Sequence, residues 1–279
     1  MAIELASKYL PYVDEIFTKE SKKSLLTNNN FTFRGAAEIL LYKVTTAEMN
    51  DYGRRGPGEG NWSRYGRVED LNATTEKFLL KKDRSFTFAI DTLDEDETVG
   101  QLSGASALAR QLREVVVPEV DSYTYGVMAE NAGHKPEAIA LTKDNIYDEI
   151  LKATSALDDA MVPDSERVLL VSPETFRIMK QNNEIIMNTE VGAENRAKGV
   201  IGVLDGALVI KVPASRLPEN FGFMLAHPIA ATAPTKLESY KLHDNPPGIN
   251  GTLVEGRIVY DAFVPDNKKV AIYYQEQTA

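Results

Sequence analysis

Cysteine is absent from the 279 residues, so the chain can form no disulfide bond and has no thiolate to offer a metal ion. Only three histidines occur, His134, His227 and His243, and they are too far apart in sequence to form a typical metal-binding pair. No apolar run reaches the length of about 18 residues that spans a membrane. The first ten residues also lack the apolar stretch of a secretory signal. We therefore expect no metal, no membrane span and no disulfide framework.

The sequence patterns of common active sites are missing as well. There is no GxSxG, no HExxH, no phosphate-binding Walker loop and no EF-hand loop. The net charge is −10, with 31 basic against 41 acidic residues, whereas a protein that binds a duplex tightly clusters Lys and Arg against the phosphates. We predict no catalytic residue and no cofactor, and only weak, non-specific contact with nucleic acid.

Residues 1–35 have the pattern of an N-terminal arm. Apolar residues recur at helical spacing from Leu5 to Phe17, and polar residues around Ser21 and Asn28 interrupt the pattern. A segment this short buries little surface by itself. We therefore expect the arm to dock on another surface.

A long β-hairpin is predicted over residues 36–92. The run from Glu38 to Met49 is rich in strand-forming residues, and the run Phe86–Ile90 alternates between large and small side chains. Between them, Gly53 to Trp62 is glycine-rich and basic. An isolated two-stranded ribbon is at best marginally stable in water. A ribbon of this length needs a supporting surface, either within the chain or on a neighbouring copy.

The glycines between the two runs raise the alternative of a phosphate cradle. Such a loop has the pattern GxxxxGK[ST] or GxGxxG between a strand and a helix. Here no Lys-Ser or Lys-Thr pair is present and no helix is expected to follow. A flexible or partner-contacting loop fits the sequence better.

Charges of opposite sign gather at the two ends of the predicted hairpin. The segment 53–67 contains four arginines and one acidic residue, Glu59. An acidic run follows the second predicted strand. An acidic run alone is typical of a solvated turn ahead of a helix. Our hypothesis is that the basic end of one copy meets the acidic run of its neighbour. The predicted inter-subunit contacts there are Arg54, Arg55, Trp62, Arg64, Arg67, Asp94, Glu95, Asp96 and Glu97.

A long helix is predicted from Val99 to Asn131, where apolar residues recur every three or four positions. The apolar stripe keeps its register across Pro118. This favours one helix bent at the proline over two helices broken at Val117-Pro118, because an unrelated break would normally reset the register.

Residues 140–228 have the pattern of a compact α/β unit. Its second predicted helix opens with Ser172-Pro173-Glu174, in which serine is the cap, proline takes the first helical position and the acid suits the helix start. The expected elements are a helix from Ile146 to Met161, strands at Arg167–Val171, Ala207–Val212 and Phe221–Ala226, and a loop at Val191–Gly206.

The C-terminal part returns to strands. Lys236–His243 and the alternating run from Thr252 to Val264 flank Asp244–Gly248, a strong turn signal with two prolines and a glycine. This predicts a second hairpin, and Val270–Tyr274 is expected to be the last strand.

The order of these segments resembles that of the tailed-phage major capsid proteins with the Hong Kong 97-type fold. Four stretches look like that family: GRVEDLNATTEKFLLKKDRSFTFAID, ALARQLREVVVPEVDSYTYGVM, RVLLVSPETFRIMKQ and EGRIVYDAFVPDNKKVAIYY. The resemblance begins at about Phe33 and rests on the order of the segments, since no single motif is diagnostic. It implies an α+β fold of the Hong Kong 97-like capsid type and a structural protein rather than an enzyme.

The resemblance also implies a division of the chain. Residues 1–35 would be an arm that crosses neighbours, and residues 36–92 an extended loop. A peripheral domain with the spine helix would comprise 93–139 and 229–266, and an axial domain 140–228 and 267–279. The turn formed by Asn245, Pro246, Pro247 and Gly248 would contact other capsomers.

The partners follow from the same resemblance. Many copies would assemble into hexamers and pentamers of an icosahedral or prolate head around double-stranded DNA, in the host bacterial cytoplasm. Some family members begin with a long scaffolding region, whereas only a short arm precedes Arg34 here. Either scaffolding is a separate protein, or such a region has already been removed, or none is used. Of these we expect a separate scaffolding protein, and the other expected partners are a portal and, in some heads, a decoration protein.

Two other readings stay open at this point. An encapsulin-type nanocompartment shell uses the same fold but needs a groove for a cargo peptide, which no feature of the sequence identifies. A soluble α/β enzyme with a glycine-rich lid loop would account for the strand–helix segment 167–182, yet it lacks an active-site motif.

Overall fold

The computed structural model describes residues 21–29, 38–56, 62–67, 70, 73–93, 104–185 and 200–278. Contacts between residues divide the chain into two units. Gly35–Leu79 form the smaller unit, which we call the hairpin, and Met1–Arg34 with Leu80–Ala279 form the larger, which we call the body. The predicted helical stretch from Leu5 to Phe17 lies outside the described residues. No helix within the described ranges is long and apolar enough to cross a membrane.

The hairpin is a two-stranded antiparallel ribbon. β1 (Glu38–Val44) pairs with β2 (Ala73–Leu79), so that Glu38 lies opposite Leu79. The prediction that Phe86–Ile90 forms the return strand was wrong, because that run lies in a strand of the body. β2 reads ATTEKFL and is mostly polar, so it carries little of the alternation by which a strand is recognised.

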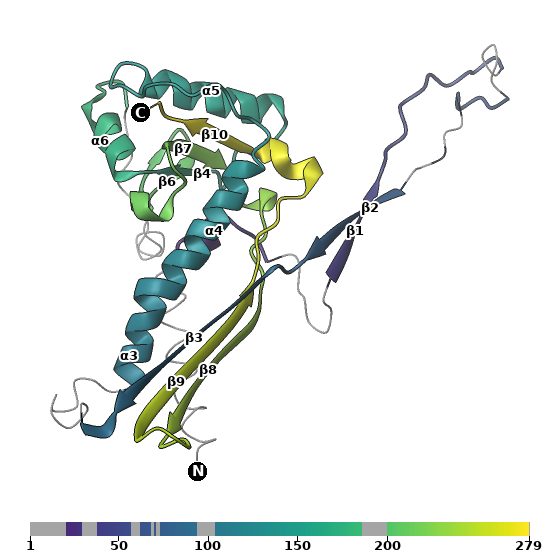
Figure 1. Ribbon diagram of the computed structural model, residues 1–279. Helices are drawn as coiled ribbons and strands as arrows, with labels where there is room; N and C mark the ends of the chain where they lie inside the picture. Colours follow the sequence, from purple (N-terminus) through teal and green to yellow (C-terminus); the bar gives the residue numbers. More distant parts are fainter. Residues whose placement is uncertain are drawn as a thin grey trace. The chain divides into compact units, whose positions relative to one another are not determined.

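Three antiparallel strands form one sheet of the body, in the order β3-β9-β8 (Figure 1). Their bounds are Lys82–Asp91 for β3, Thr235–Asp244 for β8 and Gly251–Tyr260 for β9. The second predicted hairpin is confirmed, since β8 and β9 are joined across the turn at Asn245–Gly248.

A continuous helix runs along this sheet. It consists of α3 (Gly104–Gln111), a π turn η2 (Leu112–Val116) and α4 (Val117–Glu130). Pro118 has no N–H to donate, and the wider turn lies directly before it, where the Val117 N–H reaches the Leu112 carbonyl. The prediction that one helix continues across the proline is confirmed.

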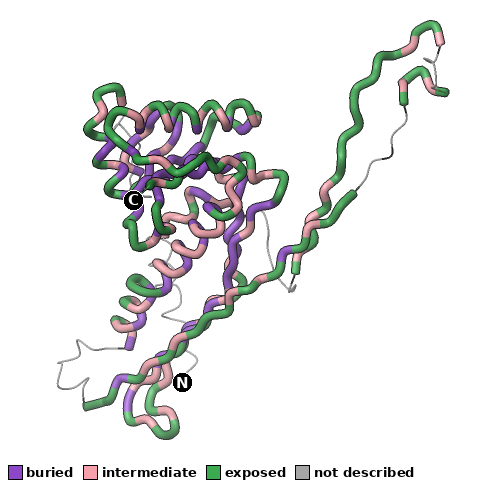
Figure 2. Tube along the Cα trace, turned by 45° about the horizontal axis from the view of Figure 1, so that its top comes forward, coloured by how far each residue is buried: buried purple, intermediate pink, exposed green. Residues whose placement is uncertain are grey.

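Apolar side chains fill the space between helix and sheet, and Figure 2 shows the buried residues on the facing sides. Gly256 of β9 lies between Phe86 and Tyr240 on the neighbouring strands, and their rings stack across it with centroids 6.2 Å apart. A larger residue at Gly256 would occupy the space of the rings. The buried members of this core are Leu108, Leu112, Val116, Val117, Val120, Tyr240, Val254, Ile258 and Tyr260.

A five-stranded sheet, ordered β10-β7-β4-β6-β5, carries the larger core. Only β4 and β6 run parallel, and the other neighbours are antiparallel. The elements of this part are α5 (Ile146–Asp159), β4 (Val168–Val171), α6 (Pro173–Gln181), β5 (Val200–Leu204), β6 (Ala207–Lys211), β7 (Phe221–Ala226) and β10 (Ile272–Glu276). The short 3-10 helices of the body are η1 (Lys23–Leu25), η3 (Ala214–Arg216), η4 (Pro228–Ala230) and η5 (Asp266–Ala271).

The start of α6 is confirmed in detail, because the Ser172 hydroxyl accepts the Thr175 N–H at 3.0 Å. The predicted loop at Val191–Gly206 was wrong for its last part, where β5 pairs with β6. Asp205 and Gly206 join these strands with φ of 47° and 83°, the left-handed conformations of a two-residue hairpin turn. An Asp-Gly pair between apolar residues was the available signal for it.

A pair of glycine substitutions tests the packing of helix on sheet. Gly256→Ala places a Cβ 2.3 Å from the end of the Phe86 ring and should lower the free energy of unfolding by about 1–3 kcal/mol. In Gly126→Ala on α4 the new Cβ meets nothing within 4 Å. The higher helix propensity of alanine should therefore raise the free energy of unfolding by about 0.5–1 kcal/mol. Denaturant unfolding of the unassembled subunit measures both, and equal effects would contradict the packing described.

Candidate assembly surface

One face of the hairpin exposes a group of apolar side chains. Side chains alternate between the faces of a strand, so Leu40, Tyr42 and Val44 share one face of β1, and Leu79 of β2 joins them. Tyr42 is 69% exposed, whereas Phe78 on the opposite face is 7% exposed. The described part of the chain thus leaves four apolar side chains exposed on one face of the ribbon, where they lie beside Glu38, Thr75 and Lys77.

The basic segment 53–67 closes on itself at its two ends. The Gly53 N–H donates to the Arg64 carbonyl at 2.8 Å, and the rings of Tyr52 and Tyr65 meet edge to face with centroids 5.1 Å apart. Trp62 is 82% exposed. Exposed tyrosine and tryptophan side chains are typical of the residues that contribute most to binding at protein interfaces.

Charges on the strands of the hairpin are paired, but those of the basic segment are not. Lys43 binds Glu76 at 2.7 Å, and Lys77 binds Glu38. The guanidinium groups of the basic segment are exposed and form no ion pair with any described residue. They belong to Arg54, Arg55, Arg64 and Arg67.

The predicted contact residues fall in different parts of the molecule. Those of the basic segment lie in the hairpin, and the turn Asn245–Gly248 lies in the body. The turn is stiff, because the Asn245 N–H donates to the Gly251 carbonyl at 2.8 Å and Asn245 and Gly248 both have positive φ. The acidic run Asp94–Glu97 lies outside the described residues. That the basic segment, the turn and the acidic run take part in subunit contacts stays a prediction.

A buried carboxylate on α4 holds the described part of the arm. Asp121 accepts the Ser21 hydroxyl at 2.7 Å and the Arg216 guanidinium at 3.3 Å, and burial raises the pKa of its carboxyl. Nearby, Leu26 is fully buried in the larger core. The described end of the arm therefore docks on the body of its own chain. The sequence pattern had predicted docking but not which surface would receive the arm.

A second buried carboxylate, Asp261, lies where β9 ends. Its Oδ1 accepts the Tyr123 hydroxyl at 2.7 Å and the Ala262 N–H at 2.8 Å, and its Oδ2 accepts the Lys81 N–H at 2.7 Å. Burial, and then the bond to Asp261, raise the pKa of the Tyr123 phenol. Lys81 is the second residue after the hairpin ends. The sequence analysis did not identify these hydrogen bonds of Asp261.

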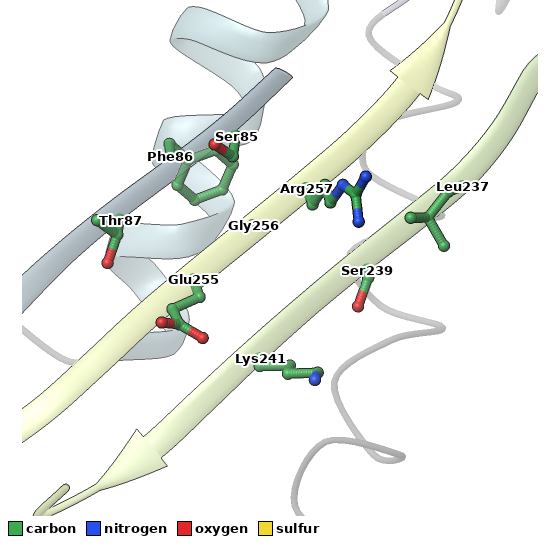
Figure 3. A pocket seen from close by; sticks show the side chains of 9 residues that line it. All are labelled: Ser85, Phe86, Thr87, Leu237, Ser239, Lys241, Glu255, Gly256 and Arg257. Atoms are coloured by element: carbon green, nitrogen blue, oxygen red, sulfur yellow. The ribbon is translucent and has the colours of Figure 1, made fainter. Parts of the chain in front are cut away.

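A groove of about 510 Å³ lies on the face of the three-stranded sheet that carries Arg257 and Glu255 (Figure 3). Arg257 pairs with Asp83 at 2.6 Å, and His243 lies 3.2 Å from Glu255. No group of three potential metal ligands occurs in the described ranges. The side chains that line the groove are Ser85, Phe86, Thr87, Leu237, Ser239, Lys241, Glu255 and Arg257. A groove lined by paired charges and by serine and threonine hydroxyls is better suited to contact with another protein surface than to catalysis.

Comparisons with known proteins agree with a shell protein. Solved structures with the same fold include one from Mycobacterium phage Che8, 18% identical with a TM-score of 0.69, covering 91% of this chain and 90% of that one. The capsid of the cyanophage P-SCSP1u is 12% identical with a TM-score of 0.68 and coverages of 92% and 87%. A virus-like particle from Pyrococcus furiosus is 12% identical with a TM-score of 0.58 and coverages of 98% and 100%. No curated protein matches the sequence.

The predicted α+β capsid fold is thereby confirmed. The fold and the family are those of a structural protein, so they do not favour the enzyme, and the family that matches is a phage one rather than that of nanocompartments. The model of the family described as phage capsid protein matches residues 73–274. Because that match covers most of the chain, the protein belongs to the phage capsid protein family.

Proposed function

We propose that the protein is the major capsid protein of a tailed phage, and that its copies assemble into the hexamers and pentamers of an icosahedral or prolate head around double-stranded DNA. The observation that carries the proposal is the open apolar face of the hairpin, at Leu40, Tyr42, Val44 and Leu79. Since a two-stranded ribbon is at best marginally stable alone, this face requires a partner. The family supports another copy of the chain in that role.

The two hydrophobic cores of the body support a division into peripheral and axial domains. One core joins the long helix to the three-stranded sheet, and the other surrounds the five-stranded sheet. We propose the first as the peripheral domain, comprising 93–139 and 229–266 with β3 added, and the second as the axial domain, comprising 140–228 and 267–279, whose core also takes in Tyr125 and Met128 of α4. The arm of residues 1–35 and the extended loop, placed here at Gly35–Leu79 in place of 36–92, would reach neighbours.

Shell stability would come from many modest contacts. Full burial of one aliphatic or aromatic side chain contributes about 1.5–3 kcal/mol. A closed shell repeats the contact in every subunit, so interfaces that are weak singly become strong together. Four apolar side chains on each hairpin would therefore be a repeated source of cohesion.

The charge of the chain supports the proposed relation to DNA. A net charge of −10 suits a container that encloses nucleic acid without gripping it, so contacts with packaged DNA would be weak and non-specific. We further propose a separate scaffolding protein and a portal as assembly partners, and assembly in the bacterial cytoplasm.

Assembly itself is the direct test. We expect size-exclusion chromatography and negative-stain microscopy of the purified protein to show rings or shells of megadalton size, because each subunit exposes a surface that another copy must cover. A small monomer or dimer at every salt and protein concentration would contradict the proposed function.

The apolar face of the hairpin can be tested at one position. Tyr42→Lys should abolish shells and leave the subunit folded, because an exposed side chain contributes little to subunit stability. Tyr42→Phe is the matched control, which keeps the apolar ring and should assemble normally. Light scattering follows assembly and circular dichroism follows folding. Normal shells from Tyr42→Lys would exclude this face as a contact.

Charge reversal tests the proposed pairing of the basic segment with the acidic run. Arg54→Glu and Asp96→Lys should each impair assembly, since each places like charges together at the contact. The double variant should recover it, and lower salt should strengthen the recovery because screening is reduced. Failure of the double variant to assemble better than either single variant would count against the pairing.

A further inference from the structure

A group of positive charges lies on the body where segments that are distant in sequence meet. The Lys22 ammonium of the arm donates to the Lys211 carbonyl at the end of β6, at 2.9 Å. We call the group the basic cluster, and its members are Lys22, Lys180 of α6, Lys211 and Arg216 of η3.

One aromatic ring brings two of these lysines together. The Lys180 ammonium lies 5.6 Å from the centre of the Phe176 ring, and the Lys211 ammonium lies 5.2 Å from it. Both are cation–π distances. Lys180 follows Phe176 by four residues on α6, so the two side chains share one face of the helix. Since both lysines are exposed, two positive charges are held at the surface beside one ring.

Little negative charge offsets the basic cluster. Within the described part of the chain, Lys22, Lys180 and Lys211 form no ion pair with a carboxylate. The carboxylate that contacts the cluster, Asp121, is buried and already binds Arg216 at 3.3 Å. Burial, and then repulsion from Arg216 and Lys211, lower the pKa of the Lys22 ammonium. On a chain with a net charge of −10, such a group of cations points to an anionic partner.

The type of side chain separates two anionic partners, the acidic surface of another copy and the phosphates of a nucleic acid. Protein interfaces are enriched in arginine and aromatic residues and depleted in lysine, and the basic segment 53–67 of the hairpin has that composition. The basic cluster instead has three lysines, and Asp121 engages its single arginine. Lysine is a hydrated point charge on a flexible stem, which suits loose contact with a phosphate backbone. The cluster therefore fits a nucleic acid better than another copy.

We propose that the basic cluster contacts the phosphates of the enclosed double-stranded DNA, and that this surface of the body faces the interior of the shell. This rests on the proposed function, because it assumes a shell that encloses DNA. The contact is independent of base sequence, since charges directed at the backbone read no bases. Four cations on an acidic chain bind weakly and in a salt-dependent way, so the DNA is touched without being gripped.

Removal of two charges tests the contact. The combined change Lys180→Gln and Lys211→Gln replaces two exposed ammonium groups by uncharged amides, so the subunit should stay folded. The matched control is Lys135→Gln with Lys268→Gln, which removes the same charge beside β10, the strand at one edge of the five-stranded sheet. Lys135 also lies 5.9 Å from the centre of a ring, that of Tyr274, so the control loses a cation–π contact too.

The readout is fluorescence anisotropy of a labelled duplex of about 30 base pairs, added to the unassembled subunit between about 50 and 200 mM salt. Each phosphate contact contributes about 0.9 to the slope of log affinity against log salt concentration. The cluster variant should therefore bind more weakly at low salt, with a slope shallower by about 2. The control variant should keep the slope of the unaltered protein, and circular dichroism checks that both variants are folded.

Intact shells test the direction in which the cluster faces. Duplex added outside a closed shell does not reach an inward surface. The difference between the unaltered protein and the cluster variant should therefore disappear once both are assembled. Assembly of the cluster variant, followed by light scattering, should be normal, because the cluster is not a contact between copies.

Each outcome decides. No binding of duplex by the unaltered subunit, an unchanged slope in the cluster variant, or an equal change in the control overturns the phosphate contact. A difference that persists in intact shells overturns the inward orientation. Loss of assembly in the cluster variant alone assigns the cluster to a contact between copies and overturns the proposal as well. If the unaltered protein forms no shells, the proposed function fails, and the duplex measurement still reports separately on the cluster.

Discussion

A two-stranded ribbon has two faces and can bury little of either by itself. In this chain Phe78 is buried on one face of the hairpin, and the other face exposes Leu40, Tyr42 and Val44 of β1 beside polar side chains. Because exposed apolar surface on this scale is unfavourable in water, the ribbon requires a cover from outside its own unit. The body must in turn hold the end of the arm and the start of β3. Membership of a capsid family fits the demand for a cover, since a shell supplies it in the form of identical neighbours.

The α4 helix meets the demand on the body. Asp121 binds the end of the arm, and Tyr123, two residues later, binds the carboxylate that holds the start of β3. Residues two apart on a helix face different directions. A single helix, packed against the sheet through its apolar stripe, therefore holds both the end of the arm and the start of β3. Its π turn before Pro118 leaves this anchoring segment, which follows the proline, regular.

Charge is distributed in keeping with self-association. The chain is acidic overall, yet four arginines occupy the exposed end of the hairpin and form no ion pair within the described ranges. An arginine-rich, aromatic surface on an acidic protein is complementary to other copies of that protein. In the proposed contact, such pairs would contribute more to the choice and orientation of a partner than to raw affinity, which the exposed apolar side chains of the hairpin would supply.

The sequence by itself determined what depends on local periodicity and local turns. The helix across Pro118, the β8–β9 hairpin and the cap at Ser172 follow from residues that are neighbours along the chain. The tertiary structure alone decided which strands pair and which carboxylates are buried. β2 is too polar to reveal itself as the partner of β1, and Asp261 lies 180 residues from Lys81 and 138 from Tyr123. Contacts over such separations depend on how whole sheets pack, and no pattern along the chain records that.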